Sequence, residues 1–455
     1  MKQMNYFFII SMFLNVAIAT LIYQHFGVDS VLSWSIIFNL IISYFLCIRC
    51  SLDDNPIKLV FIYLVGFTLF ICGRFIANVF GVSDVFCIEF GFVYCLSDLE
   101  KIKSFLLINC ALIAFLFGFI NNKTKRADNK NEIVLKYPNT LVLFFLSIVG
   151  VFLGGISLYN SYKLILSAIN NGYLSIFSEQ DGLYSTPLTL VAFTFFVAIM
   201  AIQYTYKSRI KFSLWFFRVS VLLYIVIMIS SVLQGSRSGF ITGLLFGLWL
   251  YLDKKKLNFR LVLVGIGIFF LIFIVNDLAS LSGARDAAND NGLAKFLLED
   301  VLYNQGITMM VFNMGMLNDG YPILAYLKVL FPGIQIIYGW FDTVYNYNLT
   351  FSSNLLYRLA PSVFAQGFGL GWSLLGEFYA FSFSFIPLFM LLNYGWGKLL
   401  FLISSRINYN QFFSGLFICF LTQIFMISRG SVSNLWALVI FYCIVYLLVT
   451  VRLKK

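Results

Sequence analysis

The sequence predicts an all-α, polytopic membrane protein with about 12 transmembrane helices and one long external loop that contains short helices. Of its 455 residues, 60% are hydrophobic and only 11% are charged, and the mean hydropathy is +0.89. A soluble protein carries roughly 25% charged residues, so this chain cannot cover a soluble surface. The composition also excludes a disordered chain, a collagen, a coiled coil and a nucleic-acid-binding domain, although the net charge is +11.

Twelve apolar runs supply the predicted helices. A spanning helix needs about 20 apolar residues, with a lower limit near 17 unless one end lies inside protein. Helices are the only open-chain structure that satisfies its backbone hydrogen bonds in lipid. The runs are Tyr6–Tyr23, Val31–Ile48, Leu59–Val79, Phe105–Ile120, Thr140–Leu158, Leu188–Tyr204, Leu214–Leu233, Phe240–Leu252, Leu261–Val275, Leu374–Gly395, Phe412–Ile427 and Leu435–Val451.

The distribution of lysine and arginine sets the orientation. With a cytoplasmic N-terminus, the basic loops 121–136, 205–213 and 253–260 and the C-terminal tail all lie on the cytoplasmic side. We therefore expect one membrane domain over residues 1–455 with both termini in the cytoplasm. Lys2 and Ala17-Ile18-Ala19 also resemble a cleaved secretory signal. The apolar run continues through Leu21 and Ile22, which favours a retained first helix.

A long external loop over residues 276–372 separates the ninth and tenth predicted spans. It contains apolar stretches that we expect to form short helices on the membrane face. These stretches are Phe296–Leu298, Ile307–Phe312, Ile323–Phe331 and Ile334–Trp340. A second, smaller external segment covers Tyr159–Thr186.

Residues that usually hold metals or nucleotides are scarce. The single histidine, His25, excludes a zinc site with several histidine ligands and argues against a Ser-His-Asp triad. Neither a Walker loop nor a dinucleotide fingerprint is present, so we expect no metal and no cofactor. Cys47 and Cys50 form a C-x-x-C spacing at the cytoplasmic end of the second span. No second pair lies nearby, so the spacing is weak evidence for a metal or redox site, and cysteines near apolar runs act as small hydrophobic residues. Cys87 and Cys95 share one external loop and could form a disulfide in an oxidising compartment or remain free.

Five arginines lie where the topology predicts few basic residues: Arg74, Arg237, Arg285, Arg358 and Arg429. At 1.5 Å per helical residue, Arg237 and Arg74 lie about 24 Å from the cytoplasmic edge, just below the outer surface. A guanidinium there is costly unless it faces a polar cavity or an anion. Snorkelling to lipid headgroups is the alternative for any one of them.

The sequence around these arginines favours a shared anion site. Arg237 and Arg429 lie in turns rich in glycine and serine, which allow close approach and supply donors. Arginine binds phosphate through two parallel hydrogen bonds. We therefore expect Arg74, Arg237, Arg285, Arg358 and Arg429 to bind a diphosphate at the outer surface. Glu377 is about 31 Å from the cytoplasmic edge and is placed at the mouth of that site.

Aromatic and amide side chains alternate late in the long loop. The aromatic residues are Tyr338, Trp340, Phe341, Tyr345, Tyr347, Tyr357 and Trp372, and the amides are Asn346, Asn348, Asn354 and Gln366. Flat rings beside amides suit sugar rings, whereas an interfacial aromatic belt explains the rings equally well.

This pattern resembles the Wzy-type O-antigen polymerases and their relatives in capsule and common-antigen assembly. The resemblance rests on a dozen spans, a late external loop, external arginines, and Arg358 followed after ten residues by Gly369. That spacing matches the R-x10-G pattern of a periplasmic loop in such polymerases. A second copy is absent, because Phe296 and Leu248 occupy the corresponding positions after Arg285 and Arg237.

The resemblance implies a metal-independent membrane glycosyltransferase that polymerises O-antigen or related repeat units from undecaprenyl diphosphate. The reaction would occur at the periplasmic face of a bacterial inner membrane, with a chain-length regulator as a candidate partner. Arg237 and Arg358 would stabilise the leaving diphosphate, and Glu377 would act as general base, with Glu299 and Asp300 as alternatives. A lipid-linked oligosaccharide flippase and an O-antigen ligase remain as alternative functions.

Overall fold

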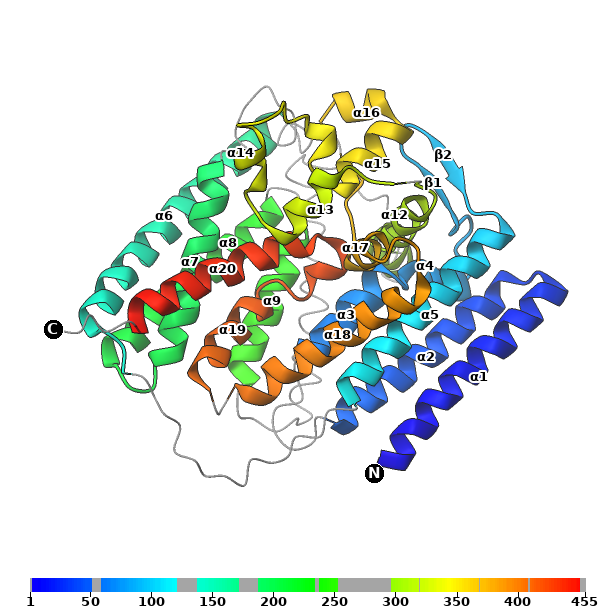
Figure 1. Cartoon of the computed structure of the whole chain (residues 1–455), viewed down its shortest axis with the longest axis horizontal. Coiled ribbons are helices and arrows are strands. Elements are labelled where there is room, and N and C mark those ends of the chain that lie inside the picture. The colour runs from blue at the N-terminus through cyan, green and yellow to red at the C-terminus, as the bar shows by residue number, and fades with distance from the viewer. Residues whose placement is uncertain are drawn as a thin grey trace. The chain divides into compact units, whose positions relative to one another are not determined.

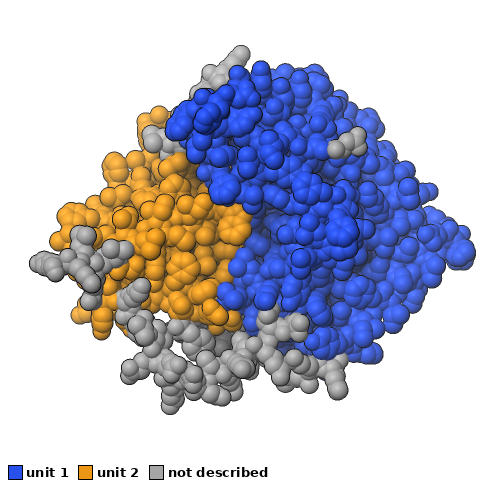
Figure 2. All heavy atoms as spheres, in the orientation of Figure 1, with its two compact units in different colours: residues 1–124, 291–402, 424–433 blue, residues 125–290, 403–423, 434–455 orange. Residues whose placement is uncertain are grey.

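A computed structural model describes residues 2–50, 59–120, 137–171, 187–233, 237–252, 296–318, 320–367, 369–407 and 410–450. The chain is divided into two compact units, each built from segments that are distant in the sequence (Figure 2). Unit 1 comprises residues 1–124, 291–402 and 424–433, and unit 2 comprises residues 125–290, 403–423 and 434–455.

The long helices of unit 1 are α1 (Lys2–Phe26), α2 (Asp29–Cys50), α5 (Asp98–Ile120) and most of α18 (Ile386–Arg406). Helices α1, α2 and α5 pack side by side (Figure 1), and amide side chains join them inside. Asn39 accepts a hydrogen bond from Asn15 at 3.0 Å and donates one to Asn109 at 2.7 Å. Such interhelical hydrogen bonds stabilise helix association in membranes, where apolar burial gives little driving force.

Helices α5 and α18 meet at two glycines. A Cβ atom at Gly118 would lie 2.0 Å from the Tyr394 carbonyl oxygen, and one at Gly397 would lie 2.0 Å from the Phe115 carbonyl oxygen. Only a hydrogen atom fits at either position, so the two backbones are in direct contact.

The third predicted span, Leu59–Val79, is broken in the structure. Helix α3 (Leu59–Phe70) and helix α4 (Gly73–Val79) are bent by 59° at Ile71 and Cys72. Gly73 and Gly306 allow α4 to approach η3 (Phe296–Tyr303) and the turn after it, because a Cβ at Gly73 would lie 2.5 Å from the Leu302 carbonyl oxygen and one at Gly306 would lie 2.6 Å from the Arg74 amide nitrogen.

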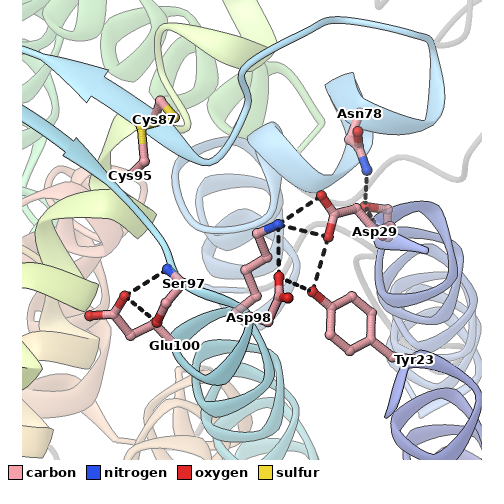
Figure 3. A network of polar contacts seen from close by, with 10 residues as sticks. Tyr23, Asp29, Asn78, Cys87, Cys95, Ser97, Asp98 and Glu100 are labelled. Atoms are coloured by element: carbon pink, nitrogen blue, oxygen red, sulfur yellow. Dashed lines mark hydrogen bonds and ion pairs between the residues drawn. A yellow bond between two sulfur atoms is a disulfide. The ribbon is translucent and has the colours of Figure 1, made fainter. Parts of the chain in front are cut away.

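A β-hairpin follows α4 and contains Cys87 and Cys95. Strand β1 (Cys87–Glu89) pairs antiparallel with β2 (Val93–Cys95), and Cys87 lies directly opposite Cys95. The disulfide between these two residues is present, so the two cysteines are not free (Figure 3). Nearby, Lys101 of α5 forms ion pairs with Asp29 and Asp98, and Tyr23 of α1 donates a hydrogen bond to Asp98 at 2.9 Å.

The late loop contains several short helices. They are η3, α12 (Ile307–Met316), α13 (Ile323–Leu330), α14 (Ile334–Tyr338), η4 (Asn346–Asn348), α15 (Phe351–Leu359), α16 (Pro361–Ala365) and α17 (Leu374–Phe381). Helix α12 was expected to lie on the membrane face, but its residues Thr308 to Met316 are all buried in unit 1. By contrast, Ile336, Trp340 and Phe341 are exposed, which is compatible with the predicted position on the membrane face.

Unit 2 is built from α6 (Thr140–Asn171), α7 (Pro187–Tyr206), α8 (Lys211–Leu233), α9 (Arg237–Leu252), α19 (Gln411–Leu421) and most of α20 (Val432–Thr450). Helices α6, α7 and α8 pack against one another, and α19 packs against α7. Gly415 of α19 lies against Thr205 and Tyr442, where a Cβ would be 2.6 Å from the threonine Oγ1. Tyr442 donates a hydrogen bond to the Phe412 carbonyl oxygen at 2.8 Å.

Among the described residues, eight helices are long and apolar enough to cross a membrane, or nine if α3 and α4 form one span. The fold class is therefore all-α and polytopic, as predicted, and the total of 12 stays a prediction. Beyond the break between α3 and α4, further predicted boundaries are wrong. Helix α6 runs to Asn171, past the predicted end at Leu158 and into the segment expected to be external. The run Leu374–Gly395 contains two helices, α17 and α18, and the run Phe412–Ile427 contains α19, a turn and the short η5 (Met426–Arg429). The predicted span Leu261–Val275 lies outside the described residues.

Candidate active site

A cavity of about 230 Å³ lies within unit 1, where four parts of the chain meet. Helix α13, the start of α15, the segment leading into α17, and the turn from η5 into α20 each contribute to its lining. The lining residues are Ala325, Lys328, Val329, Leu349, Thr350, Phe351, Ser352, Gly371, Trp372, Glu377, Arg429, Gly430, Ser431 and Ser433.

Side-chain caps fix two of the helix N-termini at this cavity. Thr350 Oγ1 accepts a hydrogen bond from the Ser353 amide at 3.0 Å and begins α15. Ser373 Oγ accepts one from the Gly376 amide at 2.9 Å and begins α17. These caps satisfy amides that a helix leaves without intrahelical partners. The first residues of α15, Phe351 and Ser352, line the cavity, so the positive end of the α15 dipole lies at it.

Glu377 lies in the first turn of α17 and is 1% exposed. Its Oε2 atom accepts a hydrogen bond from the Val432 amide, the first residue of α20, at 2.9 Å. Its Oε1 atom is buried and accepts no hydrogen bond from the described residues. Burial raises the pKa of the Glu377 carboxyl to about 7, and the Ser431 hydroxyl and the Val432 amide oppose that rise. Helix α17 is not among the candidate spans.

Arg429 reaches the same cavity from η5. Its Nη1 atom donates a hydrogen bond to Gln305 Oε1, and its guanidinium carbon lies 5.7 Å from the centroid of the Phe70 ring. Gly66 of α3 makes this position possible, because a Cβ there would lie 2.3 Å from the Phe425 carbonyl oxygen. The structure therefore brings together two of the predicted site residues, Glu377 and Arg429.

Lys328 also lines the cavity, and the sequence reasoning missed it. It is half-buried on α13, and burial lowers the pKa of its ammonium group. The lysine lies inside the apolar stretch Ile323–Phe331, which suggested only an interfacial helix. The signal available in the sequence was that this stretch contains one charged residue among apolar neighbours.

Arg74 is buried, and its guanidinium contacts protein on several sides. Nη1 donates hydrogen bonds to the carbonyl oxygens of Val85 at 3.0 Å and Cys87 at 2.6 Å. The guanidinium also stacks over the Tyr303 ring at 4.3 Å. These contacts hold the disulfide hairpin against η3, and they favour a structural role for Arg74.

The remaining predicted residues are placed as follows. Arg358 is exposed in the last turn of α15 and donates a hydrogen bond to Asn318, outside the cavity lining. Arg237 is the first residue of α9 in unit 2, and Arg285 lies outside the described residues. Glu299 and Asp300 belong to η3, and Glu299 is not among the described residues that line the cavity.

The loop aromatics divide into two groups. Tyr345, Tyr347 and Tyr357 form a stack, with 4.3 Å between the Tyr347 and Tyr357 centroids, outside the cavity lining. Trp372 and Phe351 line the cavity and stack on each other at 5.6 Å. An aromatic wall beside hydroxyl groups is suited to the apolar face of a sugar ring.

Comparison with known proteins agrees with the resemblance noted in the sequence. No curated protein and no solved structure matches the chain. The model of the family "O-antigen polysaccharide polymerase Wzy" matches residues 4–455, which is nearly the whole chain. The protein, a polytopic α-helical chain with a buried carboxylate and two cations in one cavity, therefore belongs to the O-antigen polysaccharide polymerase Wzy family.

Proposed function

We propose that this polymerase transfers a growing glycan from undecaprenyl diphosphate to a hydroxyl of a new lipid-linked repeat unit, with Glu377 as general base. The observation that carries the proposal is the buried carboxylate of Glu377 in one cavity with Arg429. At about 230 Å³ the cavity is smaller than a typical ligand pocket of about 300–1,000 Å³. It would enclose only the reacting diphosphate and the adjoining sugar.

The reaction is a glycosyl transfer without net oxidation. Glu377 takes the proton from the acceptor hydroxyl as its oxygen bonds to the anomeric carbon of the donor. The bond between that carbon and the diphosphate oxygen breaks, and its electron pair leaves with the polyprenyl diphosphate. A pKa of about 7 suits this role, because a base is most effective when its pKa is near the working pH.

Positive groups would stabilise the negative charge that develops on the leaving diphosphate. Arg429 is the arginine best placed for this, since it lines the cavity with Glu377. Arg237, Arg285 and Arg358 remain proposed diphosphate-binding residues from the sequence pattern, whereas the contacts of Arg74 favour support of the hairpin. Because guanidinium groups supply the charge stabilisation, we propose that the reaction requires no metal.

The Cys87–Cys95 disulfide supports an external position for the cavity. Disulfides persist in oxidising compartments such as the periplasm. The turn of the hairpin at Gly91 packs directly against Val363 of α16, which follows α15 in the chain (Figure 1). The hairpin and the segments that line the cavity therefore belong to neighbouring parts of unit 1. This supports a periplasmic site in the inner membrane with cytoplasmic termini, as the basic loops predict.

The test compares the glycans made by a strain that lacks this gene and carries either the wild-type protein or Glu377→Gln. Glutamine keeps an oxygen that can accept the Val432 hydrogen bond, so the fold should persist while the base is lost. We expect the variant to insert normally and to yield lipopolysaccharide with one repeat unit.

Two outcomes of this test would contradict the proposal. Long glycan made by Glu377→Gln at the wild-type level would remove Glu377 as the base. Complete loss of glycan in the deletion strain would indicate a flippase or a ligase, the two alternative functions, because neither the first repeat unit nor its attachment needs a polymerase.

A further inference from the structure

Lys328 differs in its contacts from Lys101, Arg74, Arg358 and Arg429, four cations of unit 1 whose ion pairs or hydrogen bonds the structure describes. Lys101 has ion pairs with Asp29 and Asp98, and Arg74 donates to backbone carbonyl oxygens. Arg358 and Arg429 donate to the amide oxygens of Asn318 and Gln305. Lys328 forms no ion pair or hydrogen bond with any described residue, although it lines the cavity.

A half-buried ammonium group without a partner is unfavourable, because it has lost water without gaining an opposite charge. Burial accordingly lowers the pKa of Lys328. The carboxylate in the cavity does not compensate it, since the interactions that act on Glu377 come from Ser431 and Val432 and not from Lys328. The third charged residue of the lining, Arg429, carries a positive charge like Lys328 and therefore cannot neutralise it.

The surroundings of Lys328 are suited to an anion. Thr350, Phe351 and Ser352 line the cavity at the N-terminus of α15, a helix of nine residues whose dipole is positive at that end. Ser433 adds a hydroxyl group from the start of α20, where it accepts a hydrogen bond from the Ser431 hydroxyl at 2.8 Å and keeps its own proton to donate. With the unsatisfied ammonium, these groups supply both charge and hydrogen-bond donors.

We infer that Lys328, together with the N-terminus of α15, binds the diphosphate of the lipid-linked donor inside the cavity. This inference rests on the proposed function and extends it, because it assigns the phosphate contact to a lysine of the late loop and not only to the external arginines. Glu377, whose Oε2 accepts a hydrogen bond from the Val432 amide, would then face the acceptor hydroxyl.

The experiment measures binding of inorganic pyrophosphate to the purified full-length protein in neutral detergent by calorimetry. Lys328→Met removes the charge with little change in length, and Lys328→Arg retains it. Lys103→Met, which removes one exposed positive charge from α5, is the matched control. We expect Lys328→Met to weaken binding at least tenfold, and Lys328→Arg and Lys103→Met to remain within threefold of wild type.

A pH series separates a direct contact from a change in folding. Because the pKa of Lys328 is lowered, wild-type affinity should decline at a lower alkaline pH than that of Lys328→Arg, which stays charged. Wild-type affinity in Lys328→Met, or the same pH profile in wild type and Lys328→Arg, would overturn the inference. Displacement of pyrophosphate by phosphatidylglycerol at equal concentration would also overturn it, because the site would then be a general headgroup site.

The two proposals fail in different ways. If Glu377→Gln polymerises normally while Lys328→Met loses pyrophosphate, the anion site stands and the catalytic role falls. If Glu377→Gln is inactive while Lys328→Met binds pyrophosphate normally, the catalytic role stands and the inference about Lys328 falls.

Discussion

Replacing Glu377 with glutamine removes a buried charge but keeps an oxygen that can accept the hydrogen bond from the Val432 amide. The carboxyl has an ordinary pKa of 4.5 and a pKa of about 7 in the folded protein. The folded state therefore binds this proton more tightly than the unfolded state does. The stability that protonation contributes is fully present below pH 4.5 and is lost as the pH rises through about 7.

The size of this effect follows from the two pKa values. A tenfold change in proton affinity corresponds to about 1.4 kcal/mol, so the ionised carboxylate costs the folded state about 3 kcal/mol above pH 7. Glutamine is neutral at every pH and avoids this cost. We therefore expect Glu377→Gln to unfold at a higher temperature than wild type at pH 8, and to differ little from wild type at pH 5.

Activity should change in the opposite direction. With a pKa of about 7, roughly 10% of Glu377 is ionised at pH 6 and roughly 90% at pH 8. Polymerisation by wild type should accordingly increase up to about tenfold over this range, while Glu377→Gln remains inactive. Thermal unfolding of detergent-purified protein and a polymerisation assay at each pH provide the two measurements. A difference in unfolding temperature that does not depend on pH would refute the reasoning, because the buried charge would then not be its source.

Three further predictions concern the disulfide, the metal requirement and helix packing. Reduction of the denatured protein should raise its free-thiol count by two through Cys87 and Cys95, and an unchanged count would show that the disulfide is absent. Polymerisation by purified protein should continue in EDTA, and activity that disappears and returns with a divalent metal would contradict the metal-independent mechanism. Gly397→Ala should lower stability by about 1–3 kcal/mol, because its Cβ would lie 2.0 Å from the Phe115 carbonyl oxygen. Gly395→Ala is the control, since no atom lies within 4 Å of its Cβ, and equal unfolding temperatures of the two variants would argue against close packing.

Local chemistry in the sequence predicted the features that depend on composition and spacing. The low charged fraction and the apolar runs indicate a helical membrane protein, because lipid requires each segment to satisfy its own backbone. Cys87 and Cys95 suggested a disulfide because both lie in one external loop, where an oxidising compartment would allow one. A carboxylate and a guanidinium near the outer surface need a functional or structural reason, and this makes Glu377 and Arg429 candidates from sequence alone.

Helix boundaries were less predictable, because apolar residues continue through breaks that packing creates. The run Leu374–Gly395 is mostly apolar, yet Phe383 and Ser384 adopt positive φ angles of 50° and 64° and separate α17 from α18. That break places Glu377 in a short helix that ends before the membrane-spanning helix begins. No periodicity in the run marks it.

Sequence alone thus determined the membrane environment, the helical class and the residue types that the chemistry needs, since these follow from composition and local spacing. Only the tertiary structure decided which charges share a cavity. In the structure, Arg74 donates hydrogen bonds to the carbonyl oxygens of Val85 and Cys87, and Arg358 donates one to Asn318. Lys328, Arg429 and Glu377 all line the same cavity. The physical reason is that burial and partnership of a charge depend on contacts between residues tens to hundreds of positions apart, which neither composition nor spacing encodes.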